Sequence, residues 1–182
     1  MSRPHRALVV IDMQTVFADP ASEWATPGFA SITPAVLRLI ERFSPRVVFT
    51  RFVAPEKPTG AWVDYYARWP FARQPAQSPI WDLVPELDTD DRPVVDRPTF
   101  GKWGPTLRDC VGDAPGLVLC GVSTDCCVLS TALAAADDGM PVEVVAEACA
   151  GLSEVDHQRA LDAMALYAPL ITITSEVSLM AS

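Results

Sequence analysis

The chain has 182 residues, a usual length for one domain and long enough to bury a core without disulfides or a metal. Hydrophobic residues make up 49% of it and charged residues 20%, which excludes a disordered protein. The formal net charge is -9, and the basic residues are scattered, so we expect no nucleic-acid partner.

The first apolar run, residues 7–11, ends at Asp12 and is too short for a signal sequence or a membrane span. We therefore interpret it as a strand of a cytoplasmic protein with no membrane partner. The five cysteines are an odd number without zinc-type spacing, which predicts reduced thiols and no disulfide framework.

Short apolar runs alternate with helical patterns along the chain. Runs typical of strands covered on both faces lie at residues 7–11, 46–50, 93–96, 117–120, 142–146 and 170–174. Helical spacing occurs at residues 34–43, 105–111, 126–138 and 154–167. The alternation predicts an α/β fold, a three-layer αβα sandwich around a mostly parallel, Rossmann-like sheet of about six strands. We expect a single domain over residues 1–182.

Residues 54–78 differ from the rest of the chain. They carry many prolines and four large aromatic residues, Trp62, Tyr65, Tyr66 and Trp69, without clean periodicity. Long irregular insertions in a compact domain are usually functional, so this one is expected to form a wall or lid of a site.

Ligands of a parallel α/β sheet gather beyond the carboxyl ends of its strands, where loops converge and helix N-termini point at the crevice. The residues that could bear chemistry at those ends are, in chain order, Asp12, Arg51, Arg97, Lys102, Cys126 and Cys127. The sequence therefore predicts an acid, several bases and a thiol pair at one edge of the sheet.

Cys127 falls in the first turn of a predicted helix, where free backbone N–H groups and the helix dipole would lower the pKa of a thiol. Asp12 follows five apolar residues, so its carboxylate would be desolvated and able to exchange a proton with a nearby thiol. On the residues alone, Cys127 is also consistent with an inert buried cysteine, and Asp12 with a cap at a strand end. A redox role for Cys126 and Cys127 is disfavoured, because adjacent cysteines form a strained disulfide.

Two segments, residues 8–14 (LVVIDMQ) and 121–132 (GVSTDCCVLSTA), resemble the isochorismatase-like cysteine hydrolase superfamily in sequence, order and strand context. The nucleophile motif of that family selects Cys127 over Cys126, because Val128, Thr131 and Ala132 follow it in register. The resemblance thus implies a hydrolase with Cys127 as nucleophile and Asp12 as its acid/base partner.

The resemblance also implies a cis peptide bond between Val122 and Ser123, and an oxyanion hole formed by the backbone N–H groups of Ser123 and Cys127. The implied reaction is thiolate attack on a carbonyl, departure of an amine and hydrolysis of a thioester. That reaction cleaves a C–N bond of amide or ureide type in a small molecule. The candidates for substrate contact are Phe17, Trp24, Arg51, Trp62 and Trp103.

The third catalytic residue of the family, a lysine, has two candidates in this chain. The motif register puts Arg97 at its position, and arginine could hold charge but not shuttle a proton. Alternatively, the following loop carries Lys102 back into the site. The displaced lysine also keeps open a catalytically drifted relative that only binds a small molecule.

Nicotinamidases of the superfamily bind a metal through an Asp and two His after the second strand. This chain has only His5 and His157, both far from residues 51–60, so we expect no metal and no cofactor. Members that cleave isochorismate typically lack the cysteine, so Cys127 points to another substrate. Family members are commonly dimers or tetramers, which implies a homodimer or homotetramer.

Overall fold

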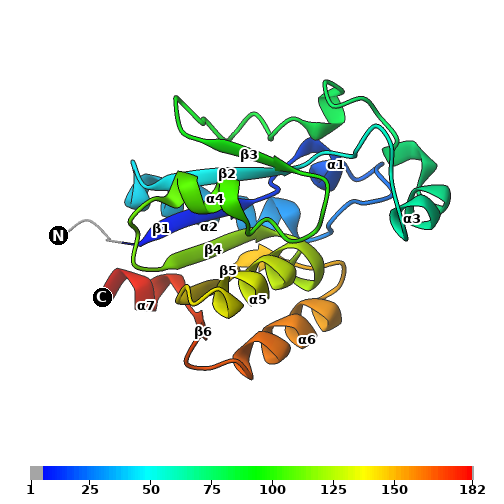
Figure 1. The fold of residues 1–182 in the computed structure, drawn as a ribbon. Helices are drawn as coiled ribbons and strands as arrows, with labels where there is room; N and C mark the ends of the chain where they lie inside the picture. Colours follow the sequence, from blue (N-terminus) through cyan, green and yellow to red (C-terminus); the bar gives the residue numbers. More distant parts are fainter. Residues whose placement is uncertain (1–5, 182) are drawn as a thin grey trace.

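A six-stranded sheet forms the centre of the computed structural model, which describes residues 6–181 (Figure 1). Its strands are β1 (Ala7–Ile11), β2 (Val47–Phe52), β3 (Val94–Arg97), β4 (Leu117–Val122), β5 (Val142–Ala150) and β6 (Ile171–Thr174). Their order in the sheet is β3-β2-β1-β4-β5-β6, and every neighbouring pair is parallel. The predicted α/β sandwich is confirmed, with a sheet that is wholly parallel.

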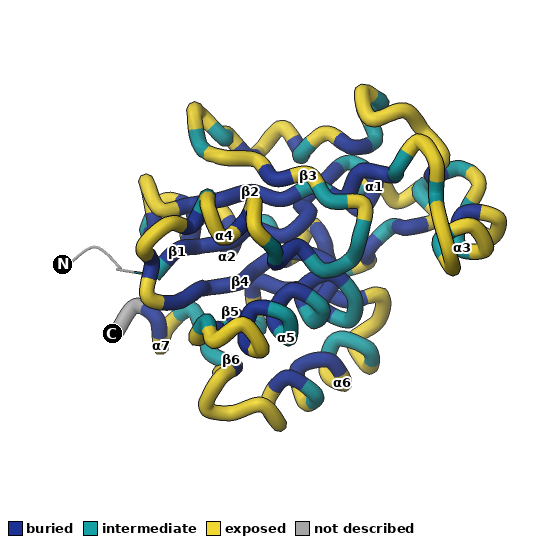
Figure 2. Tube along the Cα trace, viewed as in Figure 1, coloured by how far each residue is buried: buried dark blue, intermediate teal, exposed yellow. Residues whose placement is uncertain are grey.

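Burial of the central strands β1, β2 and β4 on both faces explains their apolar runs. In β1, Leu8 and Val10 belong to one core cluster, while Ala7, Val9 and Ile11 belong to the other. All five side chains are buried, as expected for a strand between two layers of helices (Figure 2).

Helices cover both faces of the sheet. On one face lie α1 (Thr15–Ala18), α2 (Phe29–Phe43) and α7 (Glu176–Ala181), and on the other α4 (Pro105–Val111), α5 (Leu129–Asp137) and α6 (Glu154–Ala165). Figure 1 shows α3 (Trp62–Arg68) beyond the edge where the strands end. Throughout the described residues, each helix falls short of the length and apolar character that crossing a membrane requires.

Three expected elements differ in the structure. The helix expected at 34–43 begins earlier, at Phe29, because buried Phe29 and Ile32 extend its apolar stripe ahead of Pro34. The helix expected at 126–138 is divided into a π-helical turn, Thr124–Val128, and α5. The insertion is not wholly irregular, since it contains α3 and the 3-10 turn Pro70–Ala72, which pack through aromatic side chains.

Gly121 of β4 pairs with Ile11 of β1, and the space beside its Cα cannot hold a side chain. Its φ is +113°, and a Cβ there would collide with the carbonyl group of Ile11. Gly139 also has a positive φ, +83°, but a Cβ there would meet no atom within 4 Å.

We predict that Gly121→Ala lowers the free energy of unfolding by at least about 3 kcal/mol and Gly139→Ala by about 1 kcal/mol. Urea unfolding followed by circular dichroism measures both losses, and equal losses would contradict the steric explanation.

Candidate active site

The site lies where the strand order reverses. From β1 the chain proceeds outward to β2 and β3 on one side, and β4, β5 and β6 lie on the other. Loops on the two sides of such a reversal diverge and leave a crevice at the carboxyl ends of the strands. Asp12 directly follows β1 and Cys127 follows β4. Because these strands are neighbours, both residues lie at the same crevice.

Asp12 is held in one orientation by the strand beside it. It is fully buried, and its φ of +49° is uncommon for a residue other than glycine. The Thr50 hydroxyl donates to Asp12 Oδ1 at 2.6 Å and accepts from the Asp12 N–H at 3.2 Å. The backbone and one carboxylate oxygen of Asp12 are therefore both fixed by β2.

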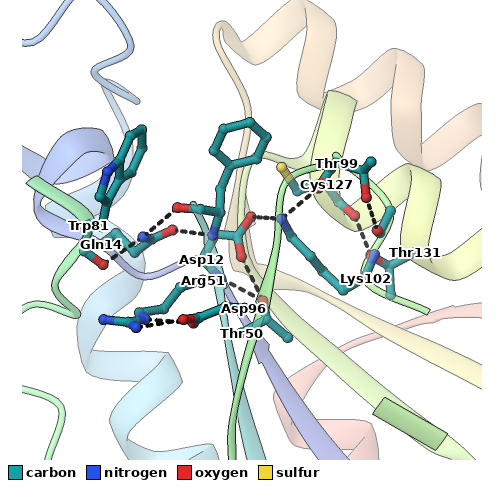
Figure 3. Close-up of polar contacts among 12 residues, drawn as sticks. Asp12, Gln14, Thr50, Arg51, Trp81, Asp96, Thr99, Lys102, Cys127 and Thr131 are labelled. Atoms are coloured by element: carbon teal, nitrogen blue, oxygen red, sulfur yellow. Dashed lines mark hydrogen bonds and ion pairs between the residues drawn. The ribbon is translucent and has the colours of Figure 1, made fainter. Parts of the chain in front are cut away.

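Lys102 occupies the other side of the Asp12 carboxylate (Figure 3). Its Nζ lies 2.8 Å from Asp12 Oδ2 and donates to the Thr99 carbonyl oxygen at 2.8 Å. Both charged side chains are fully buried, and the ammonium also lies 4.9 Å from the centre of the Phe52 ring. A buried ion pair persists only when such additional partners satisfy it.

A single hydroxyl group connects the Lys102 loop to the cysteine. The Lys102 N–H donates to Thr131 Oγ1 at 2.9 Å, and Thr131 Oγ1 donates to the Cys127 carbonyl oxygen at 2.6 Å. Figure 3 shows the Cys127 sulfur beside the Lys102 ammonium and the Asp12 carboxylate. The threonine of the nucleophile motif thus joins the backbone of Lys102 to the backbone of Cys127.

The turn that bears Cys127 begins at a cis peptide bond. The bond between Val122 and Ser123 is cis, in agreement with the resemblance. The N–H groups of Cys126 and Val128 both donate to the Ser123 carbonyl oxygen, at 3.2 and 3.0 Å. The residues on both sides of Cys127 are therefore anchored to the end of β4.

Gln14 fixes the start of the insertion relative to β1. It is fully buried, its Nε2 donates to the carbonyl oxygens of Phe52 and Trp81 at 3.0 and 2.7 Å, and its Oε1 accepts from the Phe52 N–H at 2.7 Å. One side chain therefore holds the end of β2 and the turn Pro79–Trp81 together, two residues beyond Asp12.

The environment of Cys127 raises the pKa of its thiol well above the ordinary value. Burial is the main cause, and the Asp12 carboxylate adds to it, while the Lys102 ammonium acts in the opposite direction. The lowered pKa expected from a helix N-terminus is therefore wrong, because desolvation outweighs the helix dipole. At neutral pH, Cys127 rests as a thiol beside a carboxylate.

A cavity of about 250 Å³ opens onto Cys127 and Ser123. Its walls are mainly aromatic and comprise Phe17, Trp24, Phe52, Tyr65, Trp69 and Phe100. Glu23, Thr26, Cys126 and Leu152 complete the lining. Within the described residues, Trp24 Nε1 and Thr26 Oγ1 are buried without a hydrogen-bond partner. Such a pocket suits a small, largely apolar molecule that offers one or two polar atoms.

Of the residues expected to contact substrate, Phe17 and Trp24 line this cavity and the aromatic residues Trp62 and Trp103 do not. Trp62 packs against other rings of the insertion, including Tyr66 at 6.1 Å between ring centres. Trp103 belongs to the core on the opposite face of the sheet, where its Nε1 donates to Asp138 at 2.8 Å.

Arg51 and Arg97, the two arginines predicted to belong to the site, do not line the cavity. Arg51 forms a two-pronged ion pair with Asp96 at 2.7 Å, on the edge of the sheet formed by β2 and β3. The Arg97 guanidinium packs against Gly104. Lys102, and not Arg97, therefore contacts Asp12, because the loop after β3 turns back over the end of β1.

Several residues of the cavity wall were not among the predicted substrate contacts, although the sequence contains features that indicate them. Phe52 ends β2 and Phe100 follows β3, so both stand at the carboxyl ends of strands, where ligands are expected. Tyr65 and Trp69 belong to the aromatic insertion. Glu23 had no such signal, because it lies in the loop between α1 and α2.

The described part of the chain offers no set of side chains suited to a metal ion. Within residues 6–181 no three or more His, Cys, Asp or Glu side chains gather closely enough to hold a metal ion. His157 Nδ1 lies 2.8 Å from the Thr124 hydroxyl and so ties α6 to the cysteine-bearing turn, and His5 lies outside the described residues. Residues 53–60, after β2, contain one acid, Glu56, and no histidine.

Comparison with solved structures shows the same fold in proteins of low identity. A cysteine hydrolase from Pseudomonas syringae pv. phaseolicola superposes with a TM-score of 0.83 at 18% identity, over 100% of this chain and 93% of that one. The pyrazinamidase of Pyrococcus horikoshii, in complex with zinc, superposes with a TM-score of 0.74 at 26% identity, over 94% and 99% of the two chains.

Sequence comparison points to the same group of proteins. Isochorismatase domain-containing protein 2 of Xenopus laevis is 36% identical over 99 residues, which are 53% of this chain and 48% of that protein. The chain therefore spans about half the length of this curated relative. The Isochorismatase domain model matches residues 6–175. With its all-parallel sheet and this match over nearly its whole length, the chain belongs to the isochorismatase domain family and has the fold of its hydrolases.

Proposed function

We propose that this protein is a cysteine-dependent hydrolase that cleaves an amide or ureide C–N bond of a small molecule through a thioester. The observation that carries the proposal is a thiol, Cys127, at the wall of an aromatic cavity and beside a buried Asp12–Lys102 ion pair. Acyl transfer of this kind uses a nucleophile, a base that takes its proton and a cation that orients the base. Cys127, Asp12 and Lys102 are proposed for these three roles.

The resting thiol defines the order of the proposed steps. Asp12 takes the Cys127 proton as the sulfur attacks the substrate carbonyl, because the thiolate is unfavourable in the empty, desolvated site. The backbone N–H groups of Ser123 and Cys127 bind the oxyanion, while those of the neighbours Cys126 and Val128 are engaged with the Ser123 carbonyl. Asp12 returns the proton to the departing amine and then activates the water that cleaves the thioester.

Lys102 has a supporting role in this proposal. Its ammonium holds the Asp12 carboxylate in place at 2.8 Å, and it counteracts part of the increase in the Cys127 pKa. Arg97 is not proposed for this role, since its guanidinium packs against Gly104. The presence of Lys102 beside Asp12 also speaks against a drifted binding protein, because burying an unused ion pair costs stability.

We propose that the reaction needs neither a metal nor another cofactor. The pyrazinamidase of Pyrococcus horikoshii contains zinc, whereas residues 53–60 of this chain offer one carboxylate and no histidine. The proposed partners are a small-molecule substrate and further copies of the chain in a homodimer or homotetramer in the cytoplasm. Nucleic acid is an unfavourable partner for a chain of net charge -9.

Replacement of the nucleophile tests the proposal directly. We predict that Cys127→Ala lowers kcat for release of ammonia from small primary carboxamides and ureides by at least about 1,000-fold, because Cys127 is the cavity thiol whose proton Asp12 can take. Cys110→Ala, on α4, is the matched control and is expected to retain activity. Activity that survives in Cys127→Ala, or no turnover of any compound by the wild type, would overturn the proposal.

A second pair of variants identifies the basic residue. We predict that Lys102→Met lowers kcat at least about 100-fold, whereas Arg97→Met lowers it by less than about threefold, since only the lysine contacts Asp12. Steady-state kinetics of the two variants, with circular dichroism to verify folding, measures the difference. The reverse order would assign the role to Arg97.

The pH dependence of Cys127 labelling tests the proposed resting state. Because the folded-state pKa is raised, the thiol stays protonated at pH 8, and we predict that iodoacetamide labels it rapidly only above the ordinary range of about 8.5. Asp12→Asn removes a charge that raises the pKa, so its labelling curve should shift to lower pH, and Lys102→Met should shift it to higher pH. Peptide mass spectrometry follows Cys127, with partly exposed Cys110 as internal reference. A wild-type curve centred below pH 8 would contradict this order of events.

A further inference from the structure

The charge of the pocket restricts its ligands, and this inference rests on the proposed function. Among the described residues that line the cavity, Glu23 is the one with a charged side chain, and none is lysine, arginine or histidine. A substrate carboxylate or phosphate would find no counter-ion there, and it would face the Glu23 carboxylate instead. The net charge of -9 adds to the unfavourable potential for anions.

The cation nearest to the cavity walls does not change this balance. The Lys102 ammonium lies 4.9 Å from the centre of the Phe52 ring, but it is fully buried and paired with Asp12 at 2.8 Å. The two opposite charges sum to no net charge, so Lys102 supplies no free counter-ion for a ligand, and Glu23 stays the one charged residue of the lining among those described.

The aromatic walls themselves favour a positive charge. Trp24 is the central ring, with Phe17 stacked on it at 6.2 Å, Tyr65 at 5.8 Å and the edge of Phe52 at 5.6 Å between ring centres. Ring faces carry negative potential, and cavities walled by aromatic rings are a general means of binding quaternary ammonium groups. Glu23, exposed at the loop before α2, supplies a full negative charge to the same cavity.

We propose that the substrate is a small cationic amide, with its carboxamide at Cys127 and a quaternary ammonium group among the aromatic rings near Glu23. For the simplest such compound, the trimethylammonium acetamide cation and water give trimethylammonioacetate and an ammonium ion. The carbonyl–nitrogen bond breaks, the acyl group passes to Cys127 and then to water, and the proton of the thiol leaves with the ammonia. No oxidant or reductant takes part.

Two compounds of the same shape test the proposal. Trimethylammonium acetamide and 3,3-dimethylbutanamide differ by a quaternary nitrogen in place of a quaternary carbon, and therefore in charge. Their binding to Cys127→Ala is measured by calorimetry, so the result does not depend on turnover. We expect the cation to bind at least about tenfold more tightly, and Glu23→Gln in the same background to reduce this ratio at least about threefold.

Glu41→Gln is the matched control for Glu23→Gln, because Glu41 is an exposed acid near the end of α2, at the opposite edge of the sheet. We expect it to leave the ratio of the two dissociation constants unchanged. Equal binding of the two amides, tighter binding of the neutral one, a ratio insensitive to Glu23→Gln, or no saturable binding of the cation at tens of millimolar would each overturn the inference. The proposed function is tested separately. If the wild type hydrolyses neutral amides and Cys127→Ala does not, the proposed function holds even when the inference about a cationic substrate fails.

Discussion

The buried ion pair between Lys102 and Asp12 is the interaction on which the site depends. Neither charge could remain in the interior alone, and each is satisfied by a second partner, Thr99 for the ammonium and Thr50 for the carboxylate. These partners come from β2 and from the loop after β3, so the pair joins two segments that converge on the end of β1. The raised pKa of Cys127 follows from its own burial and from the balance of these opposite charges.

The fold could be predicted well from the sequence, because strands buried on both faces leave a simple signal. The six apolar runs correspond to the six strands, and the reversal of strand order places Asp12 and Cys127 at one crevice. The extent of the helices was less predictable. The π-helical turn before α5 depends on hydrogen bonds to the Ser123 carbonyl, and helical spacing alone does not distinguish such a turn from the α-helix that follows it.

The site was predictable in its centre and less so at its walls. Asp12 and Cys127 follow from motif and position, but the choice between Arg97 and Lys102 depends on the path of a loop, which residue spacing alone does not determine. Trp62 and Trp103 show why aromatic content misleads, since a large ring is equally suited to a core and to a pocket. The pKa of Cys127 likewise depends on burial that only tertiary packing creates.

The bonds of Gln14 have a consequence for how this site can change. The side chain bonds to backbone atoms of Phe52 and Trp81, so its partners are groups that every amino acid except proline possesses in full. Substitutions in the insertion can therefore reshape the pocket without weakening the bonds that hold it to the sheet. Selection for a new ligand could act on the rings between β2 and the turn Pro79–Trp81, while the chemistry beside β1 is inherited unaltered.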